Sequence, residues 1–270
     1  MQPHVHVPYD RIGEHLSFIL DNRLNLEIYF NAASLDAMDL SSLKRLKETL
    51  SYGPSLSFHA PFMDLCPAAL DTRIRKVTLE RFHQVLAIAE ILSPGSIVFH
   101  SGYEKWKYAF NVSLWLEKSL ETWVPFNEKA RERGVKIAIE NIFEDEPSNL
   151  RMLMEAMSSG NFGICFDAGH CNLFSALPPT AWIDELKPYI IELHLHDNDK
   201  TADQHLPPGE GSIDFPALFS AMRDSDCIYT IEAHTRERVM KSLERLKGYL
   251  DQSFITAREP DNVSSGSPGR

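Results

Sequence analysis

Cysteine is scarce in this chain of 270 residues, and long apolar runs are absent. The four cysteines, Cys66, Cys165, Cys171 and Cys227, are widely spaced and form no CxxC pair, which argues against a disulfide framework. No run reaches the roughly 18 apolar residues that a membrane-spanning helix requires, and the opening stretch MQPHVHVPYD is no apolar signal segment. We therefore expect a soluble cytoplasmic protein with reduced thiols and no membrane partner.

Positive charge is also in deficit, because 27 lysines and arginines stand against 38 aspartates and glutamates, for a formal net charge of -11. Binding to phosphate backbones and to anionic membranes depends largely on Lys and Arg. Three bound divalent ions would still leave the chain acidic. The composition therefore disfavours a nucleic-acid partner.

What the chain does contain is a regular alternation of strand and helix patterns, with no dividing linker and no other internal repeat. Short apolar runs predict strands over residues 4–8, 26–30, 56–59, 96–100, 135–140, 162–167 and 228–232, and one that begins at Ile190. Helical spacing predicts helices over residues 14–22, 40–50, 71–92, 112–133, 148–159, 180–189, 215–223 and 236–251. Eight strands that alternate with eight helices predict an α/β fold, a single-domain (β/α)8 TIM barrel over residues 1–252. The tail, residues 253–270, is rich in Ser, Gly and Pro and is predicted to be disordered.

An ionisable residue ends each of the six successive strands from the third to the eighth: His59, His100, Glu140, Asp167, His194 and Glu232. In a parallel barrel these strand ends converge on one mouth, where enzymes of this fold carry their chemistry. A buried ionisable group needs a partner, because an unpaired buried charge is costly. The six residues therefore predict a functional site, against the alternative of six separately satisfied polar strand ends.

The segment after the seventh strand changes abruptly from apolar to polar. Asp203 and His205 lie there in a loop that continues into the turn sequence PPGEG, and His170 lies just beyond the sixth strand. Carboxylate and imidazole groups gathered at strand ends indicate a metal site. The alternative is that Asp203 and His205 hydrogen-bond the GEG turn or a substrate hydroxyl.

Several short motifs carry a resemblance to a known family. They are HAPF at 59–62, FHSG at 99–102, IEN at 139–141, DAGH at 167–170, HLHD at 194–197, DQH at 203–205, GEG at 209–211 and IEAH at 231–234. Together they resemble the xylose isomerase-like TIM barrel superfamily, which includes endonuclease IV (AP endonuclease family 2) and sugar-phosphate isomerases and epimerases. The resemblance runs from Val5 to about Tyr249.

The resemblance implies one of two kinds of metal site. In the endonuclease IV type, three zinc ions are held by nine residues, which here correspond to His59, His100, Glu140, Asp167, His170, His194, Asp203, His205 and Glu232. In the epimerase type, one divalent ion is held by the equivalents of Glu140, Asp167, His194 and Glu232, and the two glutamates move a proton beside a carbonyl. All nine positions carry the matching residue type. An isomerase does not need His59, His100 or the Asp-x-His pair.

These residues suggest a divalent-metal-dependent hydrolase that cleaves a phosphodiester in a small or medium-sized metabolite. The expected cofactors are two or three zinc ions, with manganese as an alternative, and Glu140 and Glu232 are the candidate catalytic residues. The long matching segments also resemble bacterial phosphodiesterases that remodel cobamides. The alternatives are a one-metal sugar or sugar-phosphate isomerase or epimerase with Glu140 and Glu232 as its acid–base pair, and a non-catalytic barrel that binds a metal and a sugar. The oligomeric state is not predicted.

The candidate contacts to a phosphorylated or sugar-containing substrate are Phe62, Tyr103, Lys105, Trp106, His196 and His234. The loop GYEKWKYAF offers aromatic and basic groups beside the predicted mouth, apt for an aromatic, phosphate-bearing substrate. Its Trp106 and Tyr108 could instead cover the helix below. His196 and His234 face inward two positions beyond predicted ligands, so they could instead support those ligands. His4 and His6 of the first strand are expected to be structural histidines.

Overall fold

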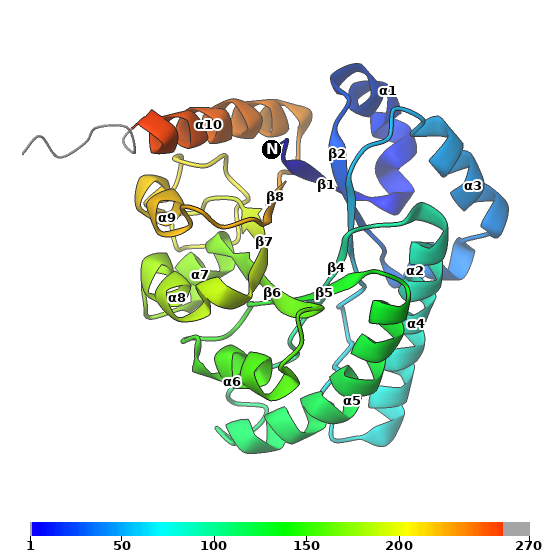
Figure 1. The fold of residues 1–270 in the computed structure, drawn as a ribbon, viewed down its shortest axis with the longest axis vertical. Helices are drawn as coiled ribbons and strands as arrows, with labels where there is room; N and C mark the ends of the chain where they lie inside the picture. Colours follow the sequence, from blue (N-terminus) through cyan, green and yellow to red (C-terminus); the bar gives the residue numbers. More distant parts are fainter. Residues whose placement is uncertain (1, 256–270) are drawn as a thin grey trace, which may run out of the picture.

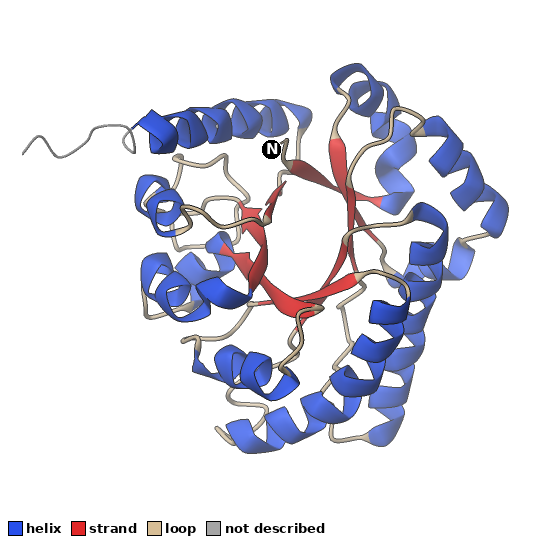
Figure 2. Cartoon of the chain, in the orientation of Figure 1, coloured by secondary structure: helices blue, strands red, loops and turns tan. Residues whose placement is uncertain are grey.

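The computed structural model describes residues 2–255, and its centre is a closed barrel of eight parallel strands in the order β1 to β8 (Figure 1). The strands are β1 His4–Pro8, β2 Asn25–Tyr29, β3 Leu56–His59, β4 Ser96–His100, β5 Lys136–Glu140, β6 Phe162–Asp167, β7 Ile190–Leu195 and β8 Ile228–Ile231. The helices surround the strands on the outside of the barrel (Figure 2). The predicted single-domain TIM barrel is confirmed.

The helices follow the predicted ones with two additions. They are α1 Ile12–Asn22, α2 Ala32–Ala37, α3 Leu40–Thr49, α4 Thr72–Leu92, α5 Val112–Glu132, α6 Ser148–Met157, α7 Ala168–Phe174, α8 Pro179–Leu186, α9 Phe215–Ala221 and α10 Arg236–Ile255, with short 3-10 helices η1 Tyr9–Arg11 and η2 Lys187–Tyr189. The prediction of eight helices is therefore wrong, because it omits α2 and α7. Each of these short helices begins at a side-chain cap, Asn31 for α2 and Asp167 for α7.

Helix α10 continues through residues 253–255, the first three residues of the predicted disordered tail. Residues 256–270 of that tail lie outside the described part of the chain. Within the described part, no helix is both long enough and apolar enough to span a membrane.

The main apolar core lies between the strands and the surrounding helices. Trp115 and Trp123 of α5 and Trp182 of α8 are fully buried. The ring of Trp123 is stacked at 5.6 Å on Phe82 of α4 and meets Phe99 of β4 edge to face at 5.4 Å. Buried aromatic side chains each remove a large apolar area from water, so this layer holds the strands in a rigid frame. The strand ends are thereby fixed relative to one another.

The barrel interior is unusual in being mostly polar. Its apolar part is the small cluster of Val98, Ala138 and Cys165. Below the mouth, the buried carboxylate of Glu192 accepts hydrogen bonds from Ser57, Ser96 and Thr230, at 2.8 to 3.0 Å. Burial, together with the nearby negative charge of Glu27, raises the pKa of Glu192 to about 8. A protonated Glu192 thus avoids two adjacent buried negative charges.

Candidate metal centre

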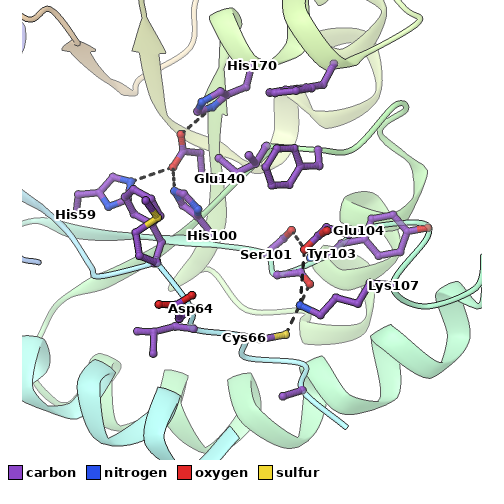
Figure 3. A pocket seen from close by; sticks show the side chains of 18 of the residues that line it. His59, Asp64, Cys66, His100, Ser101, Tyr103, Glu104, Lys107, Glu140 and His170 are labelled. Atoms are coloured by element: carbon purple, nitrogen blue, oxygen red, sulfur yellow. Dashed lines mark hydrogen bonds and ion pairs between the residues drawn. The ribbon is translucent and has the colours of Figure 1, made fainter. Parts of the chain in front are cut away.

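Glu140, at the end of β5, is the residue on which the candidate ligands converge. Its Oε2 atom lies 3.0 Å from Nε2 of His59 and 3.2 Å from Nε2 of His100, the last residues of β3 and β4 (Figure 3). Glu140 and His59 are buried, and their donor atoms are close enough together to hold one ion. This first ligand group exists because three neighbouring parallel strands end at one mouth, with His100 paired beside Glu140 and His59 paired beside Val98, two residues before His100.

A second ligand group surrounds the buried His194 of β7. Its Nδ1 atom lies 3.3 Å from Oε1 of Glu140, 3.1 Å from Oε1 of Glu232 and 3.6 Å from Oδ2 of Asp167. The pairing of β6 with β7 places Asp167 directly beside His194. Glu140 therefore contributes one oxygen to the first group and the other to the second.

The third ligand group joins α7 to the loop after β7. His170 lies with Nδ1 3.2 Å from Oε1 of Glu140 and Nε2 3.6 Å from Oδ2 of Asp203. His205 lies with Nε2 3.0 Å from the same Asp203 oxygen and Nδ1 3.4 Å from Glu232. All nine residues that the resemblance implied as ligands therefore lie at one mouth of the barrel.

The loop is held by Asp197 and not by its candidate ligands. The Asp197 carboxylate accepts hydrogen bonds from the backbone amides of Gly209 and Gly211, at 2.9 and 2.8 Å. Asp197 also pairs through its backbone with Leu206, which returns the chain toward the barrel. The alternative role of hydrogen-bonding the GEG turn thus falls to Asp197, which leaves Asp203 and His205 directed at the mouth.

Orphaned nitrogen atoms show that these residues fit a cation. The buried Nδ1 atoms of His170, His194 and His205 have no hydrogen-bond partner in the described chain, although carboxylate oxygens lie within 3.4 Å of each. Buried polar atoms are almost always hydrogen-bonded, and leaving one unsatisfied is costly. Imidazole and carboxylate groups at these separations suit zinc or manganese, which would satisfy both kinds of atom at once.

The charges of the site lead to the same conclusion. Burial alone would raise the pKa of Glu232, but His194 and His6 lower it to about 2. For Asp167 too, burial opposes ionisation, while His170 and His196 hold its pKa far below the ordinary value. The carboxylates are thus ionised because the pKa values of His170 and His194 beside them are raised, and a divalent ion would supply that positive charge in place of the histidine protons.

A cavity of about 910 Å³ opens above the ligand groups. Of the six candidate substrate contacts, Phe62 and Tyr103 line it, while Lys105, Trp106, His196 and His234 do not. The structure therefore places two of the six candidate contacts in this cavity and four outside its lining.

Two of the four residues outside the lining belong to the loop after β4. Lys105 forms an ion pair with Asp145 at 2.7 Å, and Trp106 is 75% exposed and meets Phe110 edge to face at 4.6 Å. Tyr108, in contrast, is buried and donates a hydrogen bond to the Ala68 carbonyl. Tyr103, Lys107 and Tyr108 of the same loop line the cavity, while Lys105 pairs with Asp145 and Trp106 packs on Phe110 outside its lining.

The other two residues support the ligands instead of reaching this cavity. His196 is fully buried, with Nε2 3.1 Å from both Asp167 oxygens and its ring stacked on His205 at 4.1 Å. The ring of His234 is also stacked on His205, at 4.6 Å, and it lines a separate cavity of about 350 Å³. Both histidines therefore hold ligands in place.

Comparison with known families agrees with this fold. Residues 25–250 match the family described as the xylose isomerase-like TIM barrel. The chain belongs to this family.

An uncharacterized protein of Methanocaldococcus jannaschii, MJ1311, is 33% identical to this barrel over 211 residues, 74% of this chain and 71% of that one. A solved D-tagatose 3-epimerase-like protein has a TM-score of 0.83 and 28% identity, with 94% of this chain and 99% of that one covered. A protein of Thermus thermophilus, TTHB071, solved after soaking with ZnCl2, has a TM-score of 0.78 and 29% identity, with 93% and 99% covered. Structures of L-ribulose 3-epimerase and of endonuclease IV, below 25% identity, share the fold. The resemblance inferred from the motifs is confirmed.

The xylose isomerase-like barrel contains two site residues that the sequence analysis missed. Glu27 of β2 is fully buried and lies 3.1 Å from Nε2 of His194, the nitrogen opposite the ligand atom, and 2.9 Å from Nδ1 of His6. His6, expected to be structural, lines the main cavity and lies 3.3 Å from Glu232. The sequence did contain a signal for Glu27, which is a charged residue within the apolar strand sequence NLEIY. A strand interior seldom buries a carboxylate without a function for it.

Replacement of Glu27 by Gln is expected to weaken metal binding by about 10- to 100-fold while the fold is kept. A carboxylate that accepts a hydrogen bond from the far nitrogen of a ligating histidine fixes the ring's tautomer and orientation. The measurement is a competition titration with a chromophoric chelator. Glu80→Gln on the exposed face of α4 is the control, and equal affinities in both variants would contradict the positioning role.

Glu144 makes the stability of this barrel depend on pH. Burial raises the pKa of its carboxyl from 4.5 to about 7, against hydrogen bonds from Ser101 and the Ile142 amide. The folded protein therefore keeps a proton that the unfolded chain releases above pH 4.5. The resulting stabilisation is present below that pH and is lost as pH rises through about 7.

Between about pH 5 and pH 8, the free energy of unfolding of the wild-type protein should therefore fall relative to that of the Glu144→Gln variant. The expected difference is on the order of 1–3 kcal/mol. Urea unfolding in the presence of a chelator measures the difference without a contribution from metal binding. Parallel pH profiles for the two proteins would show that Glu144 is ionised throughout.

Proposed function

We propose that this barrel is a divalent-metal-dependent hydrolase that cleaves a phosphodiester in a small or medium-sized metabolite. The observation that carries the proposal is the sharing of Glu140 between two ligand groups, with the third group 3.2 Å away through His170. An epimerase needs only the central group. The two outer groups, which include His59, His100, Asp203 and His205, have a use when several ions act on one phosphoryl group.

The nine candidate ligands form three ion-binding groups, two of which share Glu140. His59, His100 and Glu140 would hold one; Glu140, Asp167, His194 and Glu232 a second; and His170, Asp203 and His205 a third, with zinc the best match to the donor set and manganese next. When bound, such ions neutralise phosphoryl oxygens and make hydroxide available at neutral pH.

The remaining chemistry belongs to side chains of this chain. The carboxylates of Glu140 and Glu232 border the cavity, so either can accept the proton of the attacking water. The concave, acidic mouth suits a metabolite better than duplex DNA, which requires basic loops.

A sugar or sugar-phosphate epimerase is the second candidate, and one observation favours it. Glu140 and Glu232 present oxygens 3.3 and 3.1 Å from the same atom, Nδ1 of His194, so two carboxylates converge on one central point. Such a pair can remove a proton from a carbon beside a carbonyl on one face and return it on the other. The likeness to the D-tagatose 3-epimerase-like protein supports the same candidate.

The test is elemental analysis of protein purified without chelator, combined with a substrate panel. Two or three ions per chain together with hydrolysis of cobamides, nucleotides or model diesters would support the hydrolase. One ion, with manganese restoring epimerisation of ketoses or sugar phosphates to stripped protein, would overturn it. Full metal content without turnover of any substrate would point to a non-catalytic metal- and sugar-binding barrel.

A further inference from the structure

The main cavity has a wall of exposed apolar side chains opposite its polar floor. This apolar wall consists of Met63, Leu70, Ile74, Phe143 and Phe174, which are 73%, 54%, 49%, 50% and 38% exposed. They come from the segment after β3, the start of α4, the loop after β5 and the end of α7. Side chains that are distant in the sequence thus line the same cavity.

Isolated exposed apolar residues are normal, but a contiguous group beside polar residues marks a binding groove. Five of the twelve large apolar side chains exposed in the described chain line this single cavity. Phe143 and Phe174 also meet edge to face at 5.0 Å, which forms an aromatic corner. The wall is therefore concentrated at the site and is not scattered over the surface.

The candidate ligands lie together at one end of the cavity, and the exposed apolar side chains share the rest of the lining with Asp64, Asp71, Glu104 and Lys107. Figure 3 shows His59, His100, Glu140 and His170 together at one end of the cavity, away from the segment that carries Asp64 and Cys66. Phe62 lies at the boundary, with its ring stacked on His100 at 4.2 Å and 16°. An apolar face thus begins directly beside the candidate ligands.

The volume of the cavity limits the size of the ligand that would fill it. Pockets for drug-sized ligands measure about 300–1,000 Å³, and this cavity of about 910 Å³ lies near the upper limit. A phosphate group or a single sugar at the floor would leave the apolar wall in contact with water.

We propose, resting on the hydrolase function above, that the substrate is a phosphodiester with an aromatic or similarly ring-sized apolar group on one ester arm. The phosphate binds at the floor, and the apolar group binds between Phe62 and the wall formed by Ile74 and Phe143. A small molecule suits this wall better than a second protein surface, because the wall curves into a hollow that is continuous with the candidate ligands.

The experiment compares two diesters of equal charge, diphenyl phosphate and dimethyl phosphate, by isothermal titration of metal-loaded wild-type protein. Burial of the phenyl groups against the wall should make diphenyl phosphate bind at least about tenfold more tightly. The double variant Ile74→Ser/Phe143→Ser should lose most of this preference. Val77→Ser/Val124→Ser is the matched control, because both valines are about half exposed and neither lines the cavity.

Binding is measured apart from turnover, so this inference and the proposed hydrolase can fail separately. Equal affinity for the two diesters, or an equal loss of preference in the control variant, would overturn the apolar subsite even if hydrolysis occurs. A preference retained without any hydrolysis would support the subsite and count against the hydrolase. Sedimentation completes the test: a dimer that dissociates only in Ile74→Ser/Phe143→Ser would assign the wall to a second copy of the chain and overturn the proposal.

Discussion

Replacement of Glu140 by Gln is expected to reduce activity by at least about a hundredfold and to lower the metal content of the purified protein. Glu140 is the residue whose two oxygens serve two ligand groups, one toward His59 and His100 and the other toward His194. An amide offers one oxygen and one nitrogen that cannot accept, so one group loses its carboxylate ligand. Changes to residues that merely support a ligand already cost about 10- to 100-fold, so loss of a shared ligand should cost more.

The measurements are elemental analysis per chain and initial rates with a diester substrate. Glu144→Gln is the matched control, because Glu144 is a buried glutamate four residues further on that belongs to none of the ligand groups. Unchanged metal content in Glu140→Gln, or an equal loss of activity in both variants, would contradict the bridging role.

The double variant Asp203→Ala/His205→Ala is expected to lose one metal ion and nearly all hydrolytic activity, with the central ion retained. Asp203 and His205 complete the third ligand group with His170, while the central group of Glu140 and its partners makes no use of Asp203. Their loop is held by Asp197 and by Arg238, which donates hydrogen bonds to the carbonyls of the loop, so its backbone should survive the change.

This variant separates the two candidate reactions. An epimerase should keep its single ion and most of its activity, whereas a hydrolase that uses several ions should not. Asp199→Ala is the control in the same loop, because Asp199 is exposed and contacts only neighbouring loop residues. An unchanged ion count with full hydrolysis would show that Asp203 and His205 are not ligands.

The strand pattern was predictable because it depends on local physics. An apolar run of four to six residues in an alternating strand and helix sequence can be buried on both faces only in a parallel sheet, and β3, β4 and β6 have the predicted bounds. Helices α2 and α7, of six and seven residues, were missed, although α9 is also seven residues long and was predicted. Each of the two missed helices begins within three residues of the end of a strand, where a side-chain cap, Asn31 or Asp167, is the only mark of its start.

The candidate ligands at the ends of β3 to β8 were predictable for a related reason. Once the strands are parallel and adjacent, their last residues must share one mouth, so His59 and Glu232 line the same cavity although they lie far apart in the sequence. Glu27 was missed because it lies inside a strand, where the pattern gives only a charge among apolar residues. The structure shows that its carboxylate reaches His194 across the barrel.

The sequence by itself therefore determined the barrel, its family and the types of residue that gather at its mouth, because these follow from short-range periodicity and from strands that end together. Only the tertiary structure decided which loop residues face the cavity. Lys105 turns to Asp145, His196 lies behind Asp167, and the apolar wall assembles from four separate segments. Such contacts join residues distant along the chain, and their geometry depends on how every intervening element packs, which no local pattern encodes.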